Sequence, residues 1–503
     1  MSCDLCNGIS RRAFLGTSAV LSTGLLLGEQ AVAEGATASA TGSKWDQQPP
    51  VKIFVVYLGH TEHGWPGHAY DTDAAIEKEY APYLEKLRQK LGDVEFVGSD
   101  HIGNTVDASQ NLLTKIADAE AEAILLIQLS MRLNPPFQLF ISTGLPVALF
   151  APPYSGHEWI YFSDMQHAGE KIIFGASRDI NEIERLVRLI RVPVKMKKSK
   201  MILVSQPGYA AGTAAARDFA KVKETFGVEV IHVTPDQFVE IHKTIPDADA
   251  IAEAENYWIK PAKEIREPSH EEIIKSCKTY FALKKLMKER GAIALTMQCL
   301  GGVPIDVLGY PCLGFSRLLD DGAIGACEAD MDSTLSMMMF LYATGRPGFI
   351  TDPVIDTATN SVLHAHCVSA TKMDGPQSKR LPFIIRSHLE DNKGASLKVI
   401  VDRDKGRDVT WVKLAHNNTL LVTTGKLIDD YDSGIQGCRT KMVAEVTSST
   451  ARELMHNWGA NILGKDPMTL LHRVLFYGNH LDDFQDMAQL MGLKFMIEGK
   501  TWV

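Results

Sequence analysis

The run Val51-Lys52-Ile53-Phe54-Val55-Val56-Tyr57-Leu58 is apolar at every position but one and has the length of a buried β-strand. Residues Asp73 to Leu91 follow it, with apolar side chains at helical spacing and charged side chains between them. A strand that is apolar throughout has both faces covered, and in α/β proteins helices cover the two faces of a parallel sheet. This stretch therefore predicts the start of a parallel α/β lobe.

The alternation of strand and helix continues along the chain and stops near residue 350. Further strands are predicted in the first lobe at Val94 to Val97, Ala123 to Ile127 and Pro146 to Phe150, and in a second lobe at Met201 to Val204, Val228 to Val233 and Ala292 to Met297. Short β-rich runs then predict an antiparallel barrel or sandwich, at Phe383 to Arg386, Leu397 to Val401, Val409 to Leu414, Leu420 to Thr424 and Met442 to Val446. We expect two Rossmann-like parallel-sheet α/β lobes followed by a β-rich, antiparallel barrel-like C-terminal domain.

The first residues have the pattern of a twin-arginine export signal. Arg11 and Arg12 precede a short apolar stretch, Ala19 to Gly28, and Ala31-Val32-Ala33 offers a cleavage site. The apolar stretch is shorter than the roughly 20 residues that a membrane-spanning helix needs. We expect export in the folded state to the periplasm and no membrane contact after cleavage, the alternative being a disordered basic tail.

The chain length of 503 residues suggests about three domains, at roughly 150 residues each. The predicted boundaries are a signal peptide over 1–33, a linker over 34–50, an N-terminal α/β domain over 51–194, a central α/β domain over 195–347 and a β-rich domain over 348–503. The linker is assigned because its residues are mostly small or polar and end in two prolines.

The composition argues against several classes of protein. Apolar residues make up 45% and charged residues 22%, as in folded soluble proteins, and the formal net charge of -9 argues against a nucleic-acid partner. The eight cysteines are too irregularly spaced for a disulfide framework, and the CxxC pair of Cys3 and Cys6 lacks a second pair for a metal site. Gly208 and Gly212 do not fit the G-x-G-x-x-G pattern of a dinucleotide site.

The run Gly325-Ala326-Cys327-Glu328-Ala329-Asp330-Met331-Asp332 places three carboxylates within five positions. A helix that starts near Asp330 would let Asp330 and Asp332 interact with its N-terminus and leave Glu328 facing outward. Capping by the whole cluster is the alternative. A second acidic residue, Asp352, stands before Pro353, which we expect to end hydrogen bonding there. An Asp at such a place is by itself an ordinary turn residue. Together, Glu328 and Asp352 indicate a pair of functional carboxylates.

Three histidines are candidate ligands. His364 and His366 lie two positions apart and would share one face of a strand, with Cys367 pointing away. The alternative interpretation is that one of these two histidines lies in the core and the other at an edge. His480 stands directly before an Asp-rich helix start, and its alternative is a capping or surface role.

Two carboxylates with one or two imidazoles suit Mn²⁺, Co²⁺, Mg²⁺ or Fe²⁺ better than a closed thiolate zinc site. Such an ion can hold the oxygens on C1 and C2 of an open-chain sugar and stabilise an enediolate. A nearby carboxylate can then carry a proton between the two carbons.

The stretch Pro311-Cys312-Leu313-Gly314-Phe315-Ser316-Arg317-Leu318-Leu319-Asp320-Asp321-Gly322-Ala323-Ile324-Gly325-Ala326-Cys327-Glu328-Ala329-Asp330 resembles the glutamate-bearing motif of the L-fucose and L-arabinose isomerase superfamily. The resemblance covers residues 195–503 in order and spacing, and residues 51–190 only as a generic α/β lobe. It implies that Glu328 and Asp352 are metal ligands and catalytic acid/base residues, and that His366 and His480 complete the ligand set. Asn479 departs from the family, which usually has more histidine there, and the residues around His366 differ as well.

The resemblance further implies a Mn²⁺-type cofactor and homo-oligomers, commonly trimers or hexamers. It also implies that the first lobe reaches a neighbouring subunit's active site, for which His60, His63 and His68 are candidates, the alternative being a surface loop. The implied activity is that of a metal-dependent aldose-ketose isomerase, an intramolecular oxidoreductase, acting on a small sugar.

Two other functions stay open at this point. Export favours an oxidised or uncommon sugar, for which epimerisation or elimination would use the same ion and bases. A non-catalytic periplasmic sugar-binding protein is an alternative from a different class, but such a binder has no need of a metal-binding carboxylate pair.

Overall fold

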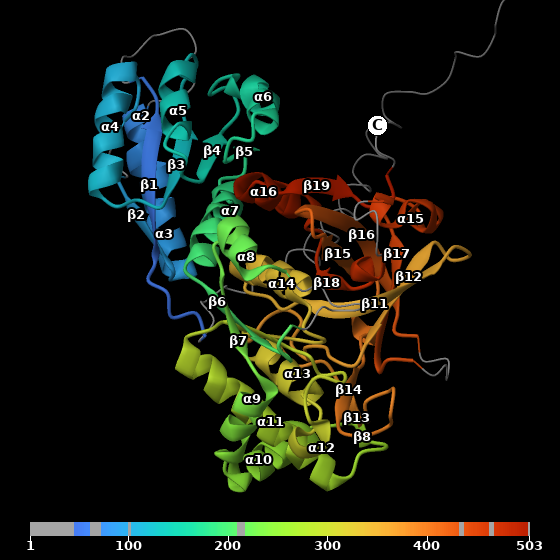
Figure 1. Ribbon diagram of the computed structural model, residues 1–503. Helices are drawn as coiled ribbons and strands as arrows, with labels where there is room; N and C mark the ends of the chain where they lie inside the picture. Colours follow the sequence, from blue (N-terminus) through green and yellow to red (C-terminus); the bar gives the residue numbers. More distant parts are fainter. Residues whose placement is uncertain are drawn as a thin grey trace, which may run out of the picture. The chain divides into compact units, whose positions relative to one another are not determined.

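In the computed structural model, the strand β1 (Val51–Leu58) lies within a five-stranded parallel sheet of order β2-β1-β3-β4-β5 (Figure 1). The other strands are β2 (Val94–Val97), β3 (Ala123–Gln128), β4 (Val147–Ala151) and β5 (Ile172–Ala176). Ile53, Val55 and Tyr57 pack in one apolar cluster with α3 (Ala81–Leu91) and α7 (Glu182–Lys197). Phe54 and Val56 pack in another with α4 (Val106–Asp118) and α5 (Asn134–Ile141). Helices on both faces explain why the strand is apolar at nearly every position.

The structure describes residues 45–60, 72–98, 102–208, 217–431, 437–461 and 467–500. These residues belong to one compact unit, Ala40–Val503. The predicted signal peptide over 1–33, Cys3, Cys6, Gly212, His63 and His68 lie outside the described residues.

A second parallel sheet has the order β10-β9-β6-β7. Its strands are β6 (Lys200–Val204), β7 (Glu229–Val233), β9 (Ala294–Met297) and β10 (Ile324–Ala326). Among its helices are α11 (His270–Arg290), α13 (Cys312–Asp320) and α14 (Met331–Thr344). The smaller helices of the two lobes are α2 (Thr72–Ala75), η2 (Ile76–Tyr80), η3 (Glu158–Tyr161), α6 (Phe162–His167), α8 (Phe219–Phe226), α9 (Pro235–Lys243), α10 (Asp247–Glu253), η4 (Ala254–Ile259) and α12 (Ile305–Leu308).

The C-terminal part is an antiparallel sheet whose strand pairings close into a ring. The strands β15, β18, β11, β12, β17 and β16 pair in that order, and β15 also pairs with β16 (Figure 1). Their bounds are β11 (Phe349–Asp356), β12 (Ser361–His366), β15 (Asp408–Leu414), β16 (Thr419–Asp429), β17 (Thr440–Val446) and β18 (Arg473–Tyr477). The expected fold class, two parallel α/β lobes followed by a barrel-like β-rich domain, is confirmed.

The remaining elements flank this ring. The strand β19 (Lys494–Ile497) adds to β16 in parallel, and β13 (Phe383–Arg386) lies between β14 (Ser396–Val399) and the short β8 (Glu264–Ile265). The C-terminal helices are η5 (Asp402–Asp404), α15 (Ala451–Asn457), η6 (Trp458–Asn461), η7 (Pro467–Leu470) and α16 (Leu481–Met491). No helix among the described residues is both long and apolar enough to cross a bilayer.

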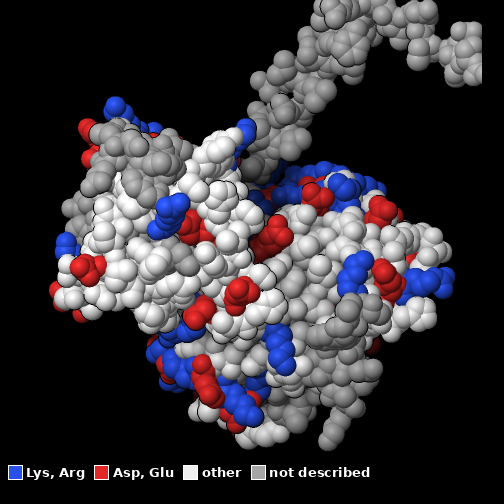
Figure 2. All heavy atoms as spheres, turned by 90° about the horizontal axis from the view of Figure 1, so that it is seen from above, with Lys and Arg blue, Asp and Glu red and all other residues white. Residues whose placement is uncertain are grey.

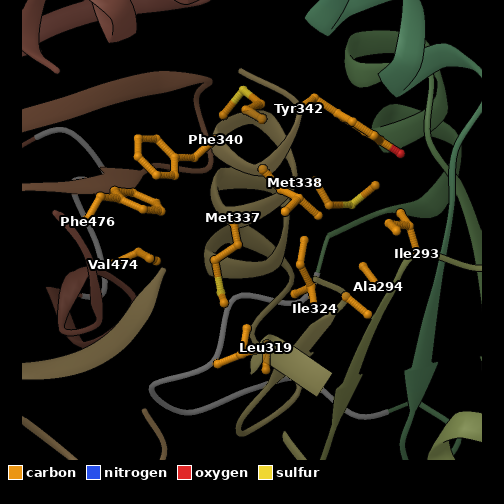
Figure 3. Packing of buried hydrophobic residues seen from close by; sticks show 14 of the residues in the cluster. Ile293, Ala294, Leu319, Ile324, Met337, Met338, Phe340, Tyr342, Val474 and Phe476 are labelled. Carbon is orange, nitrogen blue, oxygen red and sulfur yellow. The ribbon is translucent and has the colours of Figure 1, made fainter. Parts of the chain in front are cut away.

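The helix α14 joins the central sheet to the β-rich ring. Its residues Met331 to Ala343 are buried all round, which is typical of a helix with partners on every side. Figure 3 shows Met337, Met338 and Phe340 of this helix between Ala294 and Ile324 on one side and Val474 and Phe476 on the other. Because the helix is packed on all sides, its first turn has a fixed position against β18.

The strand β11 runs through Pro353, where the sequence predicted an end to hydrogen bonding. It pairs with β12 from Asp352 to Asp356, but with β18 only from Phe349 to Thr351. Beyond Thr351 the strand therefore has one side without a neighbour in the described part of the sheet, and a proline is tolerated at such an edge. This edge also leaves Asp352 accessible.

Residues 45–50, the end of the predicted linker, contact the folded chain. Asp46 forms an ion pair with the buried Lys195, and the Gln48 side-chain amide donates to Lys195 O at 3.1 Å and to Ser199 Oγ at 3.0 Å. Asp46 and Asp93, the latter at 2.9 Å, together balance the buried charge of Lys195. On the face seen in Figure 2, Lys and Arg side chains are mixed with Asp and Glu side chains.

Candidate metal centre

Glu328 lies in a strained turn between β10 and α14. Glu328 and Ala329 have φ angles of 60° and 56°, in the left-handed region that non-glycine residues rarely adopt. The turn is held by hydrogen bonds from Ala329 N to Met297 O at 2.9 Å and from Asp330 N to Cys327 O at 3.2 Å. Backbone strain of this kind costs about 1–3 kcal/mol per residue and clusters at functional sites.

Asp352 and His472 come together through the register of two strands. Thr351 of β11 pairs with Arg473 of β18, so that Asp352 and His472 stand at the next position of the antiparallel ladder. The distance from His472 Nε2 to Asp352 Oδ1 is 3.3 Å. The end of the β11–β18 ladder thus places one carboxylate and one imidazole side by side.

His366, the last residue of β12, completes the group. Its Nε2 lies 3.5 Å from Glu328 Oε1 and 3.9 Å from Asp352 Oδ2. His472 Nε2 lies 3.4 Å from Glu328 Oε2. Ligand atoms of Glu328, His366 and His472 are all within 4.8 Å of one another.

The four side chains differ in exposure. The His366 side chain is 6% exposed and the His472 side chain 1% exposed, whereas that of Asp352 is 35% exposed. The imidazoles therefore form the floor of the site, and Asp352 lies on its accessible side.

The carboxylates control the protonation of the two imidazoles in the metal-free chain. Burial alone would lower the pKa of His366, but the Glu328 carboxylate, 3.5 Å from Nε2, and the charge of Asp352 outweigh it and raise the pKa to about 9. Burial likewise opposes protonation of His472, yet its hydrogen bonds to Asp330 and Asp352 raise its pKa to about 10. For Asp352, burial is outweighed by the hydrogen bond from His472, which holds the carboxyl pKa below its usual value. Without a cation the two imidazoles thus hold protons, which a divalent ion would replace.

A fifth residue, Asp330, orients His472 from behind. Its Oδ2 lies 3.0 Å from His472 Nδ1, and its Oδ1 accepts from Ser333 N at 2.9 Å as the N-cap of α14. Burial would raise the pKa of the Asp330 carboxyl, but the Lys413 charge and the His472 hydrogen bond outweigh this effect and lower it. An ionised carboxylate behind a histidine fixes the tautomer and the direction of the other ring nitrogen, as in many metal sites.

The residues present fit a divalent cation. Two carboxylates and two imidazoles converge, and both ring nitrogens of His366 are buried without a hydrogen-bond partner among the described residues. Buried polar atoms rarely lack partners unless a ligand or ion supplies one. The oxygen and nitrogen donors suit Mn²⁺, Co²⁺ or Fe²⁺.

The structure brings together three of the four candidate ligands, Glu328, Asp352 and His366, and places His480 elsewhere. His480 Nδ1 lies 2.8 Å from Asp483 Oδ2, and its Nε2 lies 3.0 Å from Tyr477 O. The ring also packs edge-on against Phe340, about 15 Å along α14 from Asp330. The histidine in the site is therefore His472 rather than His480.

Three more residues singled out in the sequence have structural roles or lie apart. His364 packs against Trp411 at 4.8 Å between ring centroids and is hydrogen-bonded to Thr351, away from the candidate ligands. Asp332 does not cap α14 but forms a buried ion pair with Arg217. The backbone N–H of His60 donates to Ser130 Oγ, and Thr72 Oγ1 donates to the His60 carbonyl oxygen.

His472 is absent from the predicted ligands because the residues around it carry no local signal. It stands in Leu470-Leu471-His472-Arg473-Val474, at the start of an apolar run with no carboxylate nearby in the chain. Only the pairing of β18 with β11, which nothing in the local pattern specifies, could have placed it beside Asp352.

Comparisons with known proteins find distant relatives of one kind. No protein-family model matches the chain. It is 24% identical over 333 residues to proteins named sulfoquinovose isomerase from Priestia aryabhattai and from Priestia megaterium, which covers 64% of this chain and 70% of each relative. A protein of the same name from a Clostridium species is 26% identical over 205 residues, 39% of this chain and 45% of that relative.

Proposed function

We propose that this protein is a metal-dependent aldose-ketose isomerase. One observation carries the proposal, the convergence of Glu328, Asp352, His366 and His472 from four separate segments on one small volume. A purely structural role would not explain why two carboxylates and two buried imidazoles converge. The relatives named sulfoquinovose isomerase independently support sugar isomerisation as the reaction class.

The candidate ligands would hold a divalent cation, which, when bound, supplies the charge that steadies the negative oxygens of an enediolate. His366 and His472 would act as neutral ligands on the buried side. Asp352, on the accessible side, would face the arriving sugar.

Glu328 is the best candidate for carrying the proton between C1 and C2. Its carboxylate is held at the start of α14 by a strained turn, so that it needs little reorganisation during the reaction. One carboxylate that takes the proton from C2 and returns it at C1 balances the isomerisation without another reactant. Asp352, the more exposed of the two carboxylates, would assist in moving hydroxyl protons of the open chain.

The relatives' name makes sulfoquinovose, a sulfonated hexose, the first substrate to test. The purified chain, loaded with Mn²⁺, would be mixed with sulfoquinovose or with D-glucose in deuterium oxide and followed by proton NMR. We expect formation of a ketose that carries deuterium at C1 to the extent that the carboxylate exchanges its proton with the solvent between the two transfers. Release of the substrate's C2 proton without ketose would point to epimerisation or elimination instead, and no exchange with a panel of aldoses and sugar acids would contradict the proposed enzyme.

Export by the twin-arginine pathway and assembly into trimers or hexamers are also proposed. Exchanging both Arg11 and Arg12 for lysine should keep the protein in the cytoplasm, whereas unchanged export would contradict the signal. Light scattering of the purified chain measures the assembly.

A further inference from the structure

A lysine is buried directly behind the candidate metal centre. Lys413, on β15, is 1% exposed, and its Nζ lies 3.8 Å from Asp330 Oδ2 and 4.0 Å from Asp332 Oδ2. Both carboxylates are fully buried. The lysine Nζ has no hydrogen-bond partner within the described ranges, so it acts on the two carboxylates as a charge.

Apart from Lys413, which both carboxylates share, their cationic partners differ. Asp332 pairs with Arg217 Nε, and its Oδ2 lies 3.4 Å from His416 Nε2. Arg217 is held in place, because its other nitrogens donate to Asn418 Oδ1 at 2.7 Å and Ala415 O at 2.6 Å.

Asp330, in contrast, contacts His472 and Lys413. A histidine that coordinates a cation through Nε2 is neutral. In that state Lys413 is the positive charge that balances Asp330, and a buried carboxylate without such a partner costs several kcal/mol.

We propose that Lys413 is a positioning residue of the metal centre: its buried charge balances Asp330, and Asp330 in turn directs Nε2 of His472 toward the cation. The inference rests on the proposed function, since it presupposes a metal at Glu328, Asp352, His366 and His472. Lys413 would thus affect the metal affinity of the site, although its side chain would touch neither the metal nor the substrate.

The competing explanation is that Lys413 only neutralises Asp332. The two explanations predict different Mn²⁺ affinities for one double variant, Lys413→Met with Asp332→Asn. Wild-type Asp330, Asp332, Lys413 and Arg217 have charges that sum to zero, and so do the residues left in the double variant, Asp330 and Arg217. The long-range field on the cation is therefore nearly unchanged, and only the local support of Asp330 is lost.

The experiment measures Mn²⁺ binding by calorimetry and the melting temperature of the metal-free chain, for the wild type, for Asp332→Asn and for the double variant. We expect the double variant to melt like Asp332→Asn alone and to bind Mn²⁺ more weakly, on the order of 10–100-fold, the usual cost of disturbing a residue behind a metal ligand. Binding as tight as in the wild type would overturn the proposal, because Lys413 would then serve Asp332 only. A double variant that fails to fold would overturn it as well, since Lys413 would then be a structural requirement.

A control variant and the wild type make the result specific. Glu240→Gln with Lys243→Met removes an exposed ion pair of 2.7 Å far from the site in sequence and should change neither measurement. The wild type alone tests the proposed function: absence of Mn²⁺ and Co²⁺ binding there refutes the metal site itself, whereas binding in the wild type with an unaffected double variant refutes only the role of Lys413.

Discussion

His472 and Asp330 form a buried histidine–carboxylate pair, with 3.0 Å between His472 Nδ1 and Asp330 Oδ2. The pair links the N-cap of α14 to the residue just before β18, which lies 142 positions further along the sequence. It turns the opposite ring nitrogen of His472 toward Glu328 and Asp352. The central lobe and the β-rich ring therefore build the site jointly.

Glu328→Gln should abolish isomerisation and leave the fold intact. The amide keeps the shape of the side chain but cannot accept a proton, and loss of a general base typically costs about 10²–10⁴-fold in rate. Turnover and the circular dichroism spectrum check both parts. Glu240→Gln, an exposed position on α9, is the matched control and should keep full activity. Retained turnover in Glu328→Gln would remove this residue from the mechanism.

His472→Gln and His480→Gln should separate the two late histidines. We expect His472→Gln to lose most of its Mn²⁺ affinity, because Nε2 of His472 faces both carboxylates. His480→Gln should bind Mn²⁺ like the wild type and lose only about 1–2 kcal/mol of unfolding free energy, from its hydrogen bonds to Asp483 and Tyr477. Calorimetric titration with Mn²⁺ measures the difference, and the reverse order of affinities would contradict the site described above.

Chelation should lower both activity and thermal stability, and Mn²⁺ or Co²⁺ should restore both. A ligand at about 100 times its dissociation constant stabilises the folded state by about 2.7 kcal/mol. Melting curves with and without metal measure this gain. In Asp352→Asn the gain should shrink, because one carboxylate ligand is missing. A chelated sample with full activity would refute the metal requirement.

His242 should make the metal-free chain less stable in acid. Burial, followed by the charges of Lys278 and Lys275, lowers the pKa of His242 to about 4 from its ordinary 6.5. Between these two pH values the unfolded chain binds a proton that the folded chain does not, so this contribution is complete above about pH 6.5 and is lost as the pH falls toward 4. The difference of 6.5 − 4 = 2.5 pH units corresponds to at most roughly 3 kcal/mol.

Urea unfolding of the wild type and of His242→Gln at a series of pH values measures this effect. The unfolding free energy of the variant should fall less steeply between pH 6.5 and 4, while above pH 7.5 the difference between the two proteins should be constant. If the unfolding free energies of the two proteins changed in parallel over the whole pH range, His242 would be excluded as a source of the pH dependence.

Much of the fold is predictable from local pattern. The strand at Val51–Leu58 has its predicted bounds, and so does the strand at Phe383–Arg386. Buried parallel strands are continuously apolar, which makes them easy to recognise. The predicted end of hydrogen bonding at Pro353 holds only toward β18, where pairing stops at Thr351, while pairing with β12 continues to Asp356. Which of the two neighbouring strands stops there cannot be read from the residues around Pro353.

The candidate site was likewise only partly predictable from the sequence. The carboxylates Glu328 and Asp352 stand in distinctive stretches, so the sequence by itself determined that an acidic site follows the central lobe. Only the tertiary structure decided which late histidine joins them. Strand register sets that choice: pairing of Thr351 with Arg473 brings His472 to Asp352, while His480 lies one strand length away against Phe340. Register depends on contacts between distant segments and leaves no mark in the residues around either histidine.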